Sequence, residues 1–93
     1  MTLRISDLRR KISLGHYELT AHAKDEMEQD GFTIRDVKSA VYSGIIAKRQ
    51  RHGHGRRKYV VRGHGEDRRV LMIVCRLTDS GRLRMITIFA ERK

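Results

Sequence analysis

Basic side chains are concentrated in one stretch of the sequence, from Lys48 to Arg69. Its nine Lys and Arg residues face only Glu66 and Asp67, so the stretch carries +7 (nine minus two) of the net charge of +10 on the chain. An arginine guanidinium binds phosphate through two parallel N–H donors and stays charged at any working pH. The stretch therefore predicts a polyanionic partner, which is most often nucleic acid and sometimes an acidic protein.

Three cations are expected to share one face of a β-sheet. Residues 57–62 and 69–77 are rich in β-branched and aromatic side chains and predict two adjacent antiparallel strands. Because side chains alternate along a strand, the apolar set of each strand is expected to face the core, with Leu71, Ile73, Cys75 and Leu77 as the set of the second strand. Lys58, Arg62 and Arg76 are then left on the open face. One chemistry open to such a cluster is the cleavage of RNA without a metal, which needs proton transfer and cations that stabilise the phosphate. We expect Lys58 for the proton transfer and Arg62 and Arg76 for the phosphate.

His22 is a second candidate for proton transfer. It is expected in the first turn of a helix, where the helix dipole disfavours imidazolium, with Asp25 and Glu26 in reach at i+3 and i+4. A neutral, oriented imidazole is what a general base needs. The same spacing also fits a surface histidine that pairs along its helix or helps to fasten the helix to the sheet. The spacing does not decide between these interpretations.

The other members of the basic stretch are expected to hold RNA without touching the reacting phosphate. They are Arg49, Arg51, Arg56, Arg57, Arg68 and Arg69, with Tyr59 interleaved among them. Aromatic residues are otherwise scarce, so contacts to backbone phosphates would have to dominate the binding energy. The alternative is a solvated basic surface that only keeps the protein soluble.

The histidine turns do not predict a metal site. Gly53-His54-Gly55 and Gly63-His64-Gly65 resemble a pair of ligands, but the strand between them covers about 20 Å at ~3.3 Å per residue. No cysteine pair or His-x-x-x-His spacing accompanies them. We therefore expect no metal and no cofactor.

The elements that must position these residues are three helices followed by four strands. The helices are expected at Asp7 to Leu14, Ala21 to Asp30, and from a capping box of Thr33 and Asp36 to a stop at Gly44. The strands are expected at Ile45 to His52, Arg57 to Gly63, Arg68 to Thr78 and Arg82 to Glu91. This order predicts an α+β fold with three N-terminal helices packed on one face of a four-stranded antiparallel sheet.

Two details of this fold are less well determined by the pattern. His16 to Leu19 is either an edge strand or a linker. In the last strand, Ile86, Ile88 and Ala90 compete for the core face with Leu83, Met85 and Phe89. We favour the first set because its Ile pair is β-branched.

The length and composition favour one domain, residues 1–93, in the cytoplasm. A chain this short buries only about two-thirds of its unfolded surface and supports one core. Cys75 is the only cysteine and lies in an apolar run, so no intrachain disulfide is expected. The longest apolar run, Val70 to Cys75, is far short of the roughly 20 residues that span a bilayer, and the N-terminus has no signal-peptide pattern.

Several short segments together carry a resemblance to a known family. In order they are Leu19-Thr20-Ala21-His22-Ala23, Met27, Gly31-Phe32-Thr33, Asp36-Val37, Tyr59-Val60-Val61-Arg62-Gly63 and Ile86-Thr87-Ile88-Phe89. They resemble the bacterial domain-of-unknown-function family 4258 (DUF4258), and the match covers most of residues 17–90. That family looks like a relative of the BrnT and RelE type ribonuclease toxins. The resemblance implies helices packed on a small antiparallel sheet and RNA cleavage without a metal.

The resemblance bears differently on two residues of the helix at 21–30. His22 matches the histidine of the family pattern. Glu26 stands where the family commonly has arginine, which reverses the local charge, so whatever that arginine does in the family is not assigned here.

We expect a toxin-like, metal-independent endoribonuclease that cleaves messenger RNA and whose second partner is an acidic antitoxin protein. Two other functions stay open. One is a non-catalytic RNA- or DNA-binding module that uses the same sheet face, and the other is a small basic interaction protein that binds an acidic partner.

Overall fold

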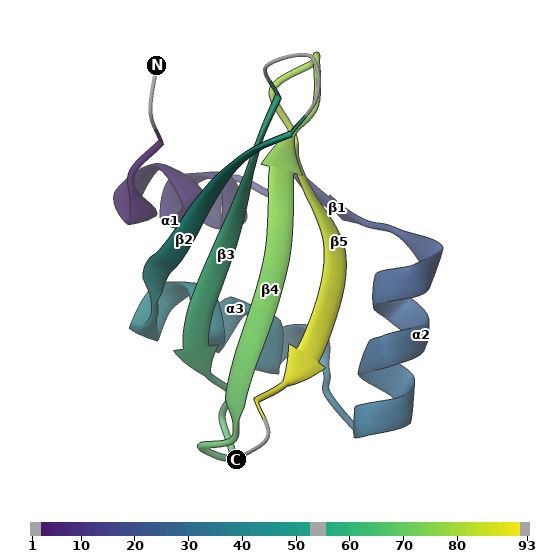
Figure 1. Cartoon of the computed structure of the whole chain (residues 1–93). Helices are drawn as coiled ribbons and strands as arrows, with labels where there is room; N and C mark the ends of the chain where they lie inside the picture. Colours follow the sequence, from purple (N-terminus) through teal and green to yellow (C-terminus); the bar gives the residue numbers. More distant parts are fainter. Residues whose placement is uncertain (1–2, 53–55, 92–93) are drawn as a thin grey trace.

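The computed structural model describes residues 3–52 and 56–91 and has an α+β architecture (Figure 1). In chain order the elements are α1 (Ile5–Ser13), β1 (Tyr17–Leu19), α2 (Ala21–Asp30), α3 (Ile34–Ser43), β2 (Ile45–His52), β3 (Arg56–His64), β4 (Val70–Leu77) and β5 (Leu83–Ala90). In this described part of the chain, each helix is too short and too polar to cross a membrane.

The sheet has five strands in the order β1-β5-β4-β3-β2, and it is mixed. Residues 17–19 form an edge strand that lies between α1 and α2 in sequence and pairs in parallel with β5, while the other neighbours are antiparallel. The predicted four-stranded antiparallel sheet after three helices is therefore wrong. Three residues are too few for the alternation of side chains to show, and a parallel pairing is made only when distant segments meet.

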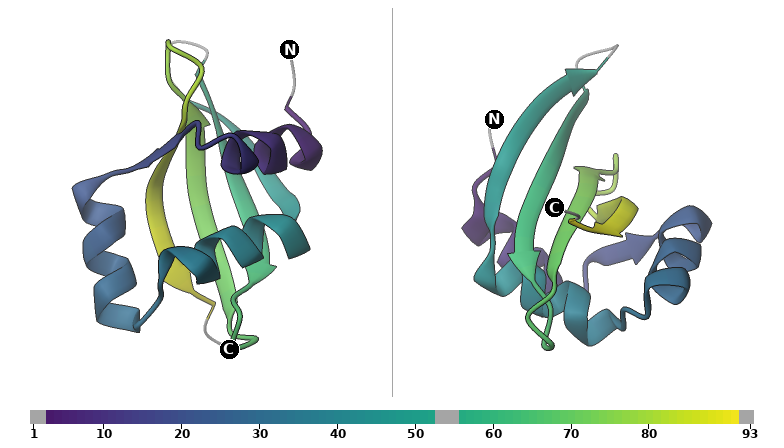
Figure 2. Two further views of the ribbon diagram at one scale, coloured as in Figure 1. Left: turned by 180° about the vertical axis from the view of Figure 1, so that it is seen from behind. Right: turned by 60° about the horizontal axis from the view of Figure 1, so that its bottom comes forward.

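The helices leave one face of the sheet open. In the left view of Figure 2, which is seen from the back, α1 and α3 cross in front of the sheet, while α2 stands beside the β5 edge. The core between the helices and the sheet includes the fully buried Leu8 of α1, Val37 of α3, Val61 of β3 and Ile73 of β4. None of the helices covers the opposite face of β2, β3, β4 and β5 in the described residues (Figure 1).

The alternation of side chains reverses partway along β5. Leu83 and Met85 are fully buried at its start, and Ile88 is fully buried after them. The register shifts by one residue between the pairs Val74–Thr87 and Cys75–Met85, which marks a β-bulge in β5. The prediction for this strand is correct for Ile88 and wrong for Leu83 and Met85, because it assumed uniform alternation.

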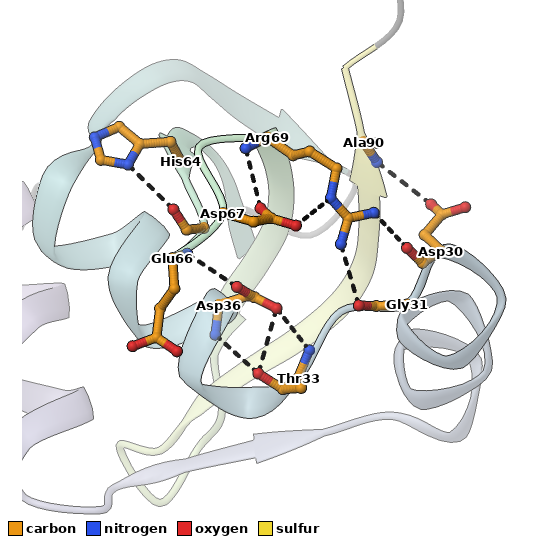
Figure 3. Close-up of polar contacts among 10 residues, drawn as sticks. Asp30, Gly31, Thr33, Asp36, His64, Glu66, Asp67, Arg69 and Ala90 are labelled. Atoms are coloured by element: carbon orange, nitrogen blue, oxygen red, sulfur yellow. Dashed lines mark hydrogen bonds and ion pairs between the residues drawn. The ribbon is translucent and has the colours of Figure 1, made fainter.

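The N-terminus of α3 is anchored to the turn between β3 and β4 (Figure 3). Thr33 and Asp36 form the predicted capping box, in which each side chain bonds the backbone of the other. Asp36 is buried, and its second carboxylate oxygen accepts a hydrogen bond from the backbone N–H of Glu66 at 2.9 Å. One carboxylate therefore holds a helix start and a distant turn together.

Candidate nucleic-acid interface

Three cations stand side by side on the open face of the sheet. Arg76 of β4 is paired with Arg84 of β5 across the ladder. On β3, Tyr59 is paired with Cys75 of β4. The antiparallel register therefore sets the preceding residue, Lys58, opposite Arg76, on the side of β4 away from β5. Neighbouring strands are about 4.8 Å apart, so the three strand positions span about 10 Å. We call Lys58, Arg76 and Arg84 the cationic row.

The cationic row ends at Glu18 of β1, which is paired with Arg84. The carboxylate accepts a hydrogen bond from Arg84 Nε at 2.8 Å and lies 3.4 Å from Arg82 Nε. The hydrogen bond from Arg84, together with the charges of both arginines, lowers the pKa of Glu18. Glu18 is shared between Arg84 and Arg82, so it offsets only one of their two charges. Together with Lys58 and Arg76, this group carries a net charge of +3 (four minus one), unlike a one-to-one ion pair.

The structure brings two of the predicted catalytic residues, Lys58 and Arg76, onto adjacent strands. Arg62 lies on the same face but four residues from Lys58, which is about 13 Å along the strand. Its Nε and Nη2 donate to the two carboxylate oxygens of Glu91 at 2.9 and 2.8 Å. This bidentate hydrogen bond raises the pKa of Arg62 and compensates its charge.

Arg84 was missed by the sequence reasoning. The expected core set of the last strand placed Leu83 and Met85 outward, which pointed Arg84 toward the helices. The signal was present in the alternation Leu83, Arg84, Met85, where two apolar residues flank a cation. The opposite alternation of Ile86, Ile88 and Ala90 later in the strand outweighed this signal in the prediction.

His22 stands at the β5 edge of the sheet. Its side chain is 66% exposed, and its Nε2 lies 3.2 Å from a carboxylate oxygen of Glu26. The same oxygen accepts a hydrogen bond from the backbone N–H of Ile88 in β5 at 2.9 Å. These contacts suit a histidine that supports the attachment of α2 to the sheet. Lys58, on β3, is separated from this edge by the width of β4 and β5.

Glu26 therefore has a structural contact in this chain. Asp30, one turn further along α2, accepts in the same way from the backbone N–H of Ala90 at 3.4 Å. The two carboxylates satisfy donors on the stretch of β5 that β1 leaves unpaired.

The predicted RNA-holding residues on β2 and β3 lie mostly away from the open face. Tyr59 is 3% exposed and its hydroxyl accepts a hydrogen bond from the backbone N–H of Leu3, so its ring lies in the core and cannot stack on a base. Arg49 is paired with Tyr59 and donates to the Leu3 carbonyl at 3.3 Å, so it points to the helix side. Arg51 and Arg57 face each other across the β2–β3 ladder beyond it.

Two further members of this set, Arg68 and Arg69, lie in the turn between β3 and β4. The guanidinium of Arg69 donates to the carbonyls of Asp30 and Gly31 at the end of α2 (Figure 3). The same group lies 4.1 Å from the centre of the Phe32 ring. It also pairs with Asp67, and the hydrogen bonds from Arg69 lower the pKa of that carboxyl group. Arg69 thus fastens the turn to α2, whereas Arg68 is exposed. Arg56 belongs to β3, but its side chain lies outside the described residues.

Metal-ligating side chains do not converge in the part of the chain that the structure describes. No group of three His, Cys, Asp or Glu side chains there could hold a metal ion. His64 lies at the end of β3, with Nδ1 3.3 Å from the carbonyl oxygen of Gly65, and His54 lies outside the described residues. Cys75 is buried, which raises the pKa of its thiol to about 12, so the thiol is protonated at neutral pH.

The fold and the open face define a small α+β protein with a single layer of helices on a mixed sheet and cations on the opposite side. The chain belongs to the family described as "Domain of unknown function (DUF4258)", which it matches over residues 19–90. The matched segment contains α2, α3 and the four strands β2 to β5, and so the whole cationic row. No curated protein and no solved structure matches the chain.

Proposed function

We propose that this protein binds RNA through the cationic row. The observation that supports the proposal best is the alignment of Lys58, Arg76 and Arg84 on three adjacent strands of a face that no described helix covers. Two fork-shaped guanidinium groups and an ammonium within about 10 Å suit successive phosphates of one nucleic-acid strand. A basic surface that served only solubility would not require the cations to be adjacent, because like charges in neighbouring strand positions repel.

RNA affinity should fall with salt in proportion to the number of phosphates held by the row. Each phosphate neutralised on a single strand contributes about −0.7 to the slope of log K against log salt, so three contacts give about −2. Arg76→Ala should make the slope shallower by about 0.7, since it removes one of these contacts. Fluorescence anisotropy with a labelled RNA oligonucleotide at four salt concentrations measures both slopes.

The control for this experiment is Arg10→Ala, which removes the same charge from the exposed surface of α1. It should leave the slope within error of that of the unmodified protein. Equal slopes for all three proteins would show that the row does not hold phosphate.

A second candidate function is metal-independent cleavage of messenger RNA, as the toxin of a toxin–antitoxin pair. Two things favour it: Lys58 lies beside Arg76, and the sequence resembles the BrnT and RelE type toxins. In this reaction Lys58 would take part in proton transfer at the 2′-hydroxyl or the leaving 5′-oxygen, and Arg76 and Arg84 would stabilise charge on the phosphate. Arg62 and His22 would contribute less, because Glu91 compensates Arg62 and His22 stands at the sheet edge.

Incubation of the purified protein with RNA in the presence of chelator tests this second function. We expect products ending in a 2′,3′-cyclic phosphate. Arg76→Ala should lower the single-turnover rate at saturating protein by about 10²-fold, the usual cost of one donor that acts on transition-state charge. His22→Ala should keep most of the rate. RNA that stays intact while it is bound would leave RNA binding as the function.

A further inference from the structure

The open face carries a second kind of surface at the other end from the cationic row. Phe89 of β5 is paired with Met72 of β4, Met72 with Arg62 of β3, and Arg62 with Ile45 of β2. Phe89 is 39% exposed and Ile45 is 60% exposed, and both count among the large apolar side chains that the fold leaves at the surface. Phe89 and its cross-strand neighbour Met72 therefore place apolar side chains on the open face, outside the core.

The charge at this end is balanced. Arg62 is held by Glu91 through two hydrogen bonds, at 2.9 and 2.8 Å, so the pair has no net charge. A phosphate gains little beside such a pair, because the carboxylate repels it as strongly as the guanidinium attracts it. A neutral flat group, in contrast, can lie on the aromatic ring without displacing a counterion.

The two ends of the open face are separated by a short distance. Arg76 and Met72 are four residues apart on β4, or about 13 Å at ~3.3 Å per residue. A strand of roughly four nucleotides, the lower end of the site sizes found in sheet-based single-strand binders, spans such a distance. The face therefore combines a positively charged end and an aromatic end within the length of one short oligonucleotide.

A second copy of this chain fits the surface less well. Two open faces brought together would set one cationic row against the other, or against an uncharged surface, and each protomer already carries a net charge of +10. Charge complementarity instead favours a polyanion that has both phosphates and flat apolar groups, and a nucleic-acid strand has both.

We propose that the protein takes single-stranded RNA, with one unpaired base stacked on Phe89 and phosphates a few nucleotides away on the cationic row. This proposal rests on the proposed RNA binding and narrows its substrate class. Every base has a π-face that can lie on an aromatic ring, so the contact requires an unpaired base but no particular sequence. A duplex keeps its bases stacked on one another and offers this face only phosphates.

The test compares Phe89→Ala, Phe89→Tyr and the unmodified protein on a labelled single-stranded RNA and on a blunt-ended RNA duplex of the same length. We expect Phe89→Ala to weaken single-strand binding about 5-fold or more, the lower end of the effect of removing a stacking aromatic residue. Phe89→Tyr should bind as the unmodified protein does, because it keeps the ring. Affinity for the duplex should be the same for all three proteins, because it has no unpaired base to stack on Phe89.

Tyr42→Ala is the matched control, because Tyr42 is an aromatic residue of similar exposure, 44%, on α3 at the covered side of the sheet. It should leave both affinities unchanged. Circular dichroism of each variant verifies that the affinities are measured on folded protein.

Three outcomes would overturn the proposal, and they can be told apart. If Phe89→Ala leaves single-strand affinity unchanged while Arg76→Ala weakens it, base stacking fails and phosphate binding survives. If the unmodified protein binds neither RNA, the proposed function fails as well. If Phe89→Ala converts a dimer to a monomer in sedimentation without affecting RNA affinity, the aromatic end is an interface between copies.

Discussion

Replacing Lys58, Arg76 and Arg84 together with alanine should weaken RNA binding by about 10³-fold or more. Hydrogen bonds to charged groups contribute roughly 1.5 to 3 kcal/mol each, so three contacts at the lower value give about 4.5 kcal/mol, and 1.4 kcal/mol is a factor of ten. The strands themselves should tolerate the change, because all three side chains point to the open face and the buried residues between them are untouched. Titration of labelled RNA at low salt measures the loss.

A triple variant with the same change in charge is the control for this result. Arg10, Lys24 and Arg35 are exposed residues of α1, α2 and α3, and replacing them with alanine also lowers the net charge by three. If binding depended on net charge alone, the two triple variants would lose affinity equally. We expect the control to lose less than about a tenth of the binding free energy that the first triple variant loses, because exposed charges beyond the screening length of roughly 10 Å act weakly.

Gly63→Ala should lower the free energy of unfolding by about 3 kcal/mol or more, at or beyond the upper end of the usual cost of overpacking. Gly63 lies on β3 directly against α3, and a Cβ there would be 2.7 Å from the backbone carbon of Ala40 and in severe overlap with its carbonyl oxygen. Both partners are backbone, so neither can rotate away, and the helix has to shift from the strand. For a chain of this size the melting temperature should fall by about 12 °C or more.

Gly15→Ala separates this close approach from the ordinary cost of losing a glycine. Gly15 has a φ of +72°, but a Cβ there meets nothing within 4 Å. Its replacement should cost only about 1 to 2 kcal/mol, the penalty of a left-handed conformation for an L-residue. Equal melting temperatures for the two variants would mean that α3 does not pack on Gly63 as described.

Local sequence signals predicted the elements that depend on neighbours along the chain. Thr33 and Asp36 are three residues apart, and the capping box that this spacing predicts is present at the start of α3. The alternation in β4 placed Leu71, Ile73 and Cys75 in the core, and all three are buried. These predictions succeed because both capping and alternation are governed by geometry within one turn or one pleat.

Pairing between distant segments was beyond the reach of those signals. The parallel strand β1 has only three residues and joins β5, which lies more than sixty residues away in sequence. The bulge in β5 reverses which side chains face the core and so decides that Arg84 joins the open face. The local pattern does not decide either feature, because the pairing of β1 and the position of the bulge are set only when the strands are assembled.

The sequence by itself determined the charge of this protein, its three helices, four of its five strands, and the placement of Lys58 and Arg76 on one sheet face. Only the tertiary structure decided which cations are adjacent and which are compensated. Arg62 and Glu91 are 29 residues apart, so no argument from residue spacing along one helix or strand would pair them. They nevertheless form a bidentate ion pair. A cation's availability for phosphate depends on the carboxylates around it in space, and that arrangement exists only once the strands are in register.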